Sequence, residues 1–173
     1  MNLNRNDLTN NRSVLLIFLL EFLDKDPYCK ELKSDWLNQW AAMGLLASFS
    51  RVYLNAEPAT KNLVPWFMDR VARDLLILES SNEQQFKEFI NKLSGYDLAA
   101  LESMHVIVEK YHIDPEELSK DLKGSLSKIT DGDDRTACMF NMFADGVFHA
   151  EVRILSYLYE QWFGIKYVYE SNK

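Results

Sequence analysis

The chain contains few of the residues that interrupt helices or build special loops. Its 173 residues include only six glycines and four prolines, a composition unlike that of collagen-like or low-complexity disordered chains. It has no Gly-rich phosphate loop, and no run of strand length alternates between apolar and polar residues. Apolar residues instead recur at helical spacing between sparse turn signals. The sequence therefore predicts an all-α protein.

Cysteine, positive charge and long apolar runs are also scarce. Cys29 and Cys138 lie far apart with no Cys-x-x-Cys spacing, so a disulfide framework is not expected and a reducing, cytoplasmic compartment is. The formal net charge of −7 argues against non-specific nucleic-acid binding, which needs Lys and Arg to neutralise phosphates. No apolar run reaches the roughly 18 to 20 residues that span a bilayer. We expect neither a nucleic-acid-binding nor a membrane-spanning protein.

Cap and turn signals predict a bundle of about seven or eight helices. Residues 1–12 are polar and are expected to form a loose tail, and residues 13–173 a single helical domain. The first helix is apolar on nearly every side, which favours a central place in the core. The expected helices, or their caps, start at Ser13, Ser34, Thr60 or Asn62, Ser80 or Ser81, Asp97, Asp114, Thr130 or Asp131, and after Gly146.

An acidic turn signal lies near the end of the chain. Asp145-Gly146 separates two apolar-periodic segments, and this pair favours a turn because Gly tolerates positive φ and Asp bonds nearby backbone. Apolar residues then follow at helical spacing up to Gly164, which is expected to end the last helix. We therefore expect the last two helices to fold back on each other as a hairpin.

This elbow resembles the second half of TerB-like proteins, a group named after tellurite-resistance operons that includes a domain of a DnaJ-type co-chaperone. The similarity lies within residues 140–165 and rests on Ala144-Asp145-Gly146, Phe148, Glu151 and Gly164-Ile165. It implies paired helical hairpins and a non-catalytic interaction or stress-response role with a protein partner. In some members acidic loop groups bind a divalent metal, and the residues of that pattern that carry over are Asp145 and Glu151.

Simpler roles for these acids remain open. Asp145 can hold the turn and Glu151 can favour a helix start, where the macrodipole attracts negative charge. The run from Asp131 to Asp134 looks like a calcium loop but fails the EF-hand pattern, because Arg135 and Thr136 occupy the fifth and sixth positions. Capping is sufficient to explain that run.

An alternative chemistry comes from a repeated spacing. Glu102-x-x-His105 and Glu109-x-x-His112 match the pattern of di-iron helical bundles. Both histidines are expected near an apolar stripe, and Glu21 is the acid inside another apolar helix. A di-metal oxidoreductase is therefore one alternative function, although solvated histidines explain the same pattern.

Cysteine chemistry and the acidic net charge suggest two further roles. Cys138 lies among apolar residues and is expected to be a small buried hydrophobe, although His105 or His149 beside it would suggest nucleophilic catalysis. The third functional alternative is a small acidic adaptor or neutralising protein that binds one basic partner.

Overall fold

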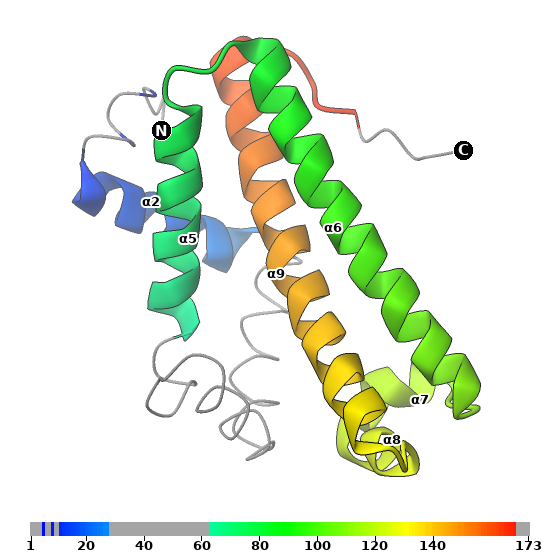
Figure 1. Cartoon of the computed structure of the whole chain (residues 1–173). Coiled ribbons are helices and arrows are strands. Elements are labelled where there is room, and N and C mark those ends of the chain that lie inside the picture. The colour runs from blue at the N-terminus through cyan, green and yellow to red at the C-terminus, as the bar shows by residue number, and fades with distance from the viewer. Residues whose placement is uncertain (1–4, 6–7, 9–10, 28–62, 169–173) are drawn as a thin grey trace. The chain divides into compact units, whose positions relative to one another are not determined.

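The computed structural model describes Arg5, Leu8 and residues 11–27 and 63–168 (Figure 1). All regular secondary structure in these ranges is helical, which confirms the all-α prediction for the described part of the chain. The predicted helix from Ser34 and the turn after it lie outside these ranges. The helices are α2 (Arg12–Lys25), α5 (Leu63–Leu78), α6 (Glu83–Lys110), α7 (Pro115–Lys120), α8 (Leu122–Lys128) and α9 (Gly132–Phe163).

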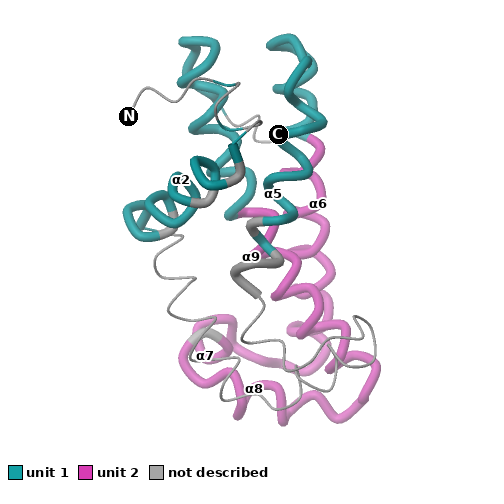
Figure 2. The backbone as a smooth tube through the Cα atoms, turned by 90° about the vertical axis from the view of Figure 1, so that its left-hand side faces the viewer, with its two compact units in different colours: residues 1–91, 150–173 teal, residues 92–149 magenta. Residues whose placement is uncertain are grey.

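The chain groups into two compact units (Figure 2). Unit 1 comprises residues 1–91 and 150–173, and unit 2 comprises residues 92–149. The helices α6 and α9 each contribute residues to both units. Among the described ranges, no helix is long and apolar enough to cross a membrane.

Helix α2 starts two residues earlier than its sequence suggests. Asn11 is the N-cap, and its side-chain oxygen accepts from the backbone N–H groups of Ser13 and Val14. The helix stops at Lys25, with Asp26 as its C-cap. Asn and Ser are comparably good N-caps, so residue type alone does not distinguish Asn11 from Ser13 as the cap.

The expected burial of α2 on nearly every side is wrong. Leu15, Phe18 and Leu19 are buried, whereas Ile17 and Leu20 are exposed. The buried face packs on α5, and Phe18 also lies 6.1 Å from the ring of Tyr157 on α9. Helix α2 is therefore amphipathic in its packing although its sequence is apolar on both faces.

One long helix, α6, replaces the two that the sequence predicts between Ser81 and Tyr111. Asn82 and Gln85 form a reciprocal capping box, in which each side chain accepts from the other's backbone N–H. The predicted break at Ser94-Gly95 is absent, and the helix continues to Lys110. A glycine inside a helix costs only about 1 kcal/mol. Burial of the apolar stripe offsets that cost, and the stripe comprises Phe86, Ile90, Leu93, Ala100, Ile107 and Val108.

The predicted elbow at Asp145-Gly146 is also wrong, because α9 is unbroken from Gly132 to Phe163. Gly146 is buried within the helix, and its neighbour Val147 is 3% exposed. Local turn propensity is outweighed here by an apolar stripe that keeps helical phase on both sides of the pair. The hairpin that the TerB-like resemblance implies is therefore not formed at this position.

The ends of α9 agree with the sequence. Asp131 Oδ1 accepts from the backbone N–H groups of Asp133 and Asp134, which makes it the N-cap. Gly164 follows the last helical residue with a φ of 68°, a left-handed conformation that glycine adopts without a Cβ penalty. The segment beyond it returns to unit 1, since Tyr167 is buried and its hydroxyl donates to Asn91 Oδ1 at 2.5 Å.

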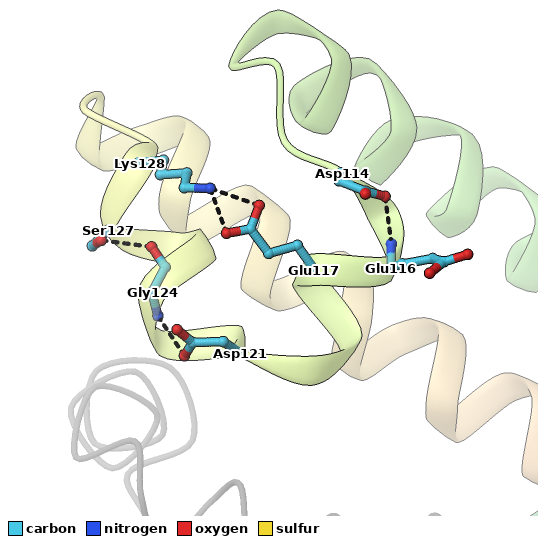
Figure 3. A network of polar contacts seen from close by, with 7 residues as sticks. All are labelled: Asp114, Glu116, Glu117, Asp121, Gly124, Ser127 and Lys128. Atoms are coloured by element: carbon cyan, nitrogen blue, oxygen red, sulfur yellow. Dashed lines mark hydrogen bonds and ion pairs between the residues drawn. The ribbon is translucent and has the colours of Figure 1, made fainter.

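The short helices α7 and α8 are joined by caps and one ion pair (Figure 3). Asp114 caps α7 as predicted, with Pro115 at its first position. Asp121 Oδ1 accepts from the backbone N–H of Gly124 at 2.9 Å and so caps α8. Lys128 Nζ donates to both carboxylate oxygens of Glu117 at 2.6 and 2.7 Å. These contacts order the connection between α6 and α9 within unit 2.

Helix α6 ends in a Schellman motif with an unusual residue at its left-handed position. The backbone N–H of Ile113 donates to Val108 O, and that of His112 donates to Glu109 O. His112 has a φ of 51°, whereas glycine normally occupies this position. Val108 and Ile113 are both buried, in keeping with the apolar contact that accompanies this motif.

We expect His112→Gly to raise the free energy of unfolding by about 1 kcal/mol, because glycine removes the Cβ cost of positive φ. Urea denaturation at constant pH measures the change. The matched control is His105→Gly, which places glycine at an exposed position inside α6 and should lower stability by about 1 kcal/mol. A loss of stability in His112→Gly would contradict the assignment.

Candidate functional site

The two candidate ligands on α9, Asp145 and Glu151, both have raised pKa values. They lie in different units. Asp145 belongs to unit 2 and Glu151 to unit 1. Each lies beside a second carboxyl group from another helix.

The unit 2 cluster consists of Asp97 on α6 and Asp145 and His149 on α9. His149 Nδ1 lies 3.0 Å from Asp97 Oδ2, and Asp97 is largely buried. Asp145 precedes His149 by one helical turn and lies beside Asp97. Burial, followed by the neighbouring Asp97 carboxyl, raises the pKa of Asp145 to about 7, against a smaller lowering by His149. Two adjacent carboxyls thus favour holding one proton between them.

The unit 1 cluster consists of Arg70 and Asp74 on α5 and Glu151 on α9. The Glu151 side chain is 0% exposed, and its Oε2 accepts from Arg70 Nε at 2.8 Å. Its other oxygen, Oε1, is buried and accepts no hydrogen bond within the described ranges. Burial first, and then the neighbouring Asp74 carboxyl, raises the pKa of Glu151 to about 8. The Arg70 charge alone would lower that pKa, so burial and Asp74 outweigh the ion pair.

Both clusters are suited to holding protons. In each, one carboxyl group can donate to another when it is protonated, whereas full ionisation would leave two negative charges adjacent to each other in a largely dry environment. The ring of His149 is 37% exposed, so solvent can reach the unit 2 cluster through the imidazole.

The Glu-x-x-His residues do not form a buried constellation. Glu102, His105, Glu109 and His112 are all exposed. Glu21, on α2, is also exposed and pairs with Lys25 Nζ at 3.0 Å. Among the residues that the structure describes, no group of three or more His, Cys, Asp or Glu side chains could hold a metal ion.

Cys138 is buried, as predicted. Burial raises the pKa of its thiol, which is the opposite of what a reactive thiolate requires. The side chain therefore behaves as a small hydrophobe in unit 2.

Sequence reasoning missed three members of the clusters, namely Arg70, Asp74 and Asp97. A signal was present, because Asp74 falls three residues after buried Val71 and Asp97 four residues after buried Leu93. A charged residue in phase with an apolar stripe implies burial against a partner. Asp97 was instead expected to be a helix cap, because Asp after Gly95 resembles a helix start.

The comparisons with known proteins add no relative to this description. Neither the models of known protein families, nor the curated proteins, nor the solved structures contain a match to this chain.

Proposed function

We propose that this protein is a non-catalytic helical module whose folded state responds to proton concentration and which acts by binding a protein partner. The observation that carries the proposal is the pairing of carboxyl groups on α9. Asp145 lies beside Asp97, and Glu151 lies beside Asp74, and burial together with the neighbouring carboxyl raises the pKa of each α9 acid. A proton on one carboxyl of a pair allows it to donate to the other.

The proton dependence has a definite sign. The pKa of Asp145 rises from 3.8 to about 7 on folding and that of Glu151 from 4.5 to about 8. Between these values the folded state binds more protons than the unfolded chain, so stability falls as pH rises. The contribution of the two groups is complete below about pH 4 and is lost as pH passes through about 7 to 8.

Exposed aliphatic side chains support the protein-partner part of the proposal. Ile17 and Leu20 on α2 and Leu76 and Ile77 on α5 are all exposed, with Ile77 at 66%. Both helices bury their opposite faces in unit 1 and pack on each other. Exposed apolar groups on adjacent helices are a common feature of protein-binding surfaces. A stress-response role is implied by the TerB-like resemblance over residues 140–165 alone.

The test is the free energy of unfolding of the unmodified protein between about pH 5 and pH 9, measured by urea denaturation. We expect a net decrease of several kcal/mol across this range, because a difference of one pKa unit between the folded and unfolded states corresponds to about 1.4 kcal/mol. The variant Asp145→Asn/Glu151→Gln is expected to lose most of this slope. A flat profile in the unmodified protein would overturn the proposal.

A further inference from the structure

We propose that Phe86, Trp162 and Phe163, together with the carbonyl oxygens at the end of α5, form a pocket for a guanidinium group. Arg5 of the same chain occupies this pocket, and an exposed arginine of a partner protein competes for it. The pocket lies within unit 1 and contains no residue of the carboxyl clusters.

The walls of the pocket are aromatic. The central carbon of the Arg5 guanidinium lies 6.0, 5.3 and 5.7 Å from the ring centroids of Phe86, Trp162 and Phe163. A cation within about 6 Å of a ring centroid is attracted by the ring quadrupole, and Trp is the strongest such partner. Three rings around one guanidinium therefore form a cation-selective enclosure.

The remaining side of the pocket presents oxygen acceptors. Arg5 Nη2 donates to Leu78 O and, at 2.9 Å, to both the carbonyl oxygen and Oγ of Ser81. Leu78 is the last residue of α5, and a helix C-terminus carries partial negative charge. The Leu78 carbonyl oxygen also accepts from the backbone N–H and the hydroxyl of Ser81. The planar, multi-donor guanidinium fits rings and carbonyls together, whereas an ammonium group cannot stack in this way.

Contacts among the rings and helices hold the walls in place independently of Arg5. The Phe86 ring lies 5.7 Å from Trp162 and 5.8 Å from Phe163, both nearly edge-on. Tyr159 packs on Phe163 at 5.2 Å, and its hydroxyl donates to Glu83 Oε1 at 2.8 Å. Trp162 and Phe163 are only half-buried, so a ligand from solvent can reach them once Arg5 moves.

Arg5 is an internal competitor for this pocket. Burial lowers the pKa of its guanidinium, and the charge of Glu79 partly opposes this effect. The lowered pKa reflects the loss of hydration when the guanidinium occupies the pocket. A tethered group acts at an effective concentration in the millimolar range. Removing its side chain should therefore raise the apparent affinity for an external guanidinium by at least about tenfold.

The test uses the full chain carrying Arg5→Ala, with N-acetyl-arginine amide as the probe and ¹⁵N-labelled indole groups as the reporter. We expect a saturable shift of the Trp162 Nε1–H resonance, with a Kd at least about tenfold lower than in the unmodified protein. N-acetyl-lysine amide should bind more weakly, and Trp162→Leu in the same background should abolish arginine binding.

Three results would overturn the proposal. They are the absence of a saturable shift in Arg5→Ala up to about 50 mM probe, equal affinity in the variant and the unmodified protein, and equal binding of the lysine probe. Arg5→Gln replaces Arg5→Ala if the latter does not unfold cooperatively. The pH profile of stability does not depend on this pocket. A negative result with the arginine probe therefore does not affect the proton proposal, and a flat pH profile does not affect the pocket proposal.

Discussion

Glu151→Gln is expected to raise the free energy of unfolding at pH 8 by on the order of 2 kcal/mol. The Glu151 carboxyl, whose pKa is raised to about 8 in the folded state, begins to ionise there beside Asp74. Glutamine has the same shape and does not titrate. Its amide oxygen can accept from Arg70 Nε, and its amide nitrogen can donate to Asp74 as the protonated acid does.

The same variant should change little below about pH 4, where the carboxyl carries its proton in both the folded and unfolded states. Urea denaturation at several pH values measures this difference in slope. Glu102→Gln is the matched control, because Glu102 is exposed on α6 and should shift stability by no more than about 0.5 kcal/mol. Parallel pH profiles for Glu151→Gln and the unmodified protein would rule out a titrating Glu151.

Phe86→Ala is expected to lower the free energy of unfolding by about 3 to 5 kcal/mol. Phe86 is 0% exposed, and its ring contacts Tyr159, Trp162 and Phe163 at centroid distances of 5.7 to 6.0 Å. Truncation removes buried apolar surface and three aromatic pairs, and it leaves a cavity that rigid helices fill only partly.

Thermal and urea unfolding of Phe86→Ala measure this loss, and Phe86→Leu should cost less because more of the volume is retained. The control is Ile77→Ala, which truncates a side chain that is 66% exposed and should cost less than about 1 kcal/mol. Similar losses for Phe86→Ala and Ile77→Ala would show that the aromatic cluster is not a core of unit 1.

Helix ends were predictable from the sequence where a cap is a local property. Asp114-Pro115, Asp131 and Gly164 each satisfy or end the backbone within a few residues of themselves. Asp145-Gly146 and Ser94-Gly95 have similar turn propensity but lie inside α9 and α6. Burial of apolar stripes along these helices outweighs a preference worth about 1 kcal/mol, and no local pattern reveals that.

The candidate site was predictable only in part for the same reason. Asp145 and Glu151 were singled out by their positions, but the carboxyls beside them, Asp97 and Asp74, come from helices distant in sequence. Proton sharing is a property of such pairs, so one helix cannot reveal it. His112 could not have been assigned from spacing either, since its role is set by a backbone φ of 51°.

The division of the chain has a consequence for folding during synthesis. Unit 2 is one uninterrupted stretch, whereas unit 1 needs residues 1–91 and residues 150–173 together. The ribosome releases residues 92–149 before the second part of unit 1, so the α7–α8 segment can assemble first. Leu75, Phe86 and other side chains of unit 1 then remain without the end of α9 until residues 150–173 have left the ribosome, and during this interval the nascent chain is most exposed to aggregation and to chaperones.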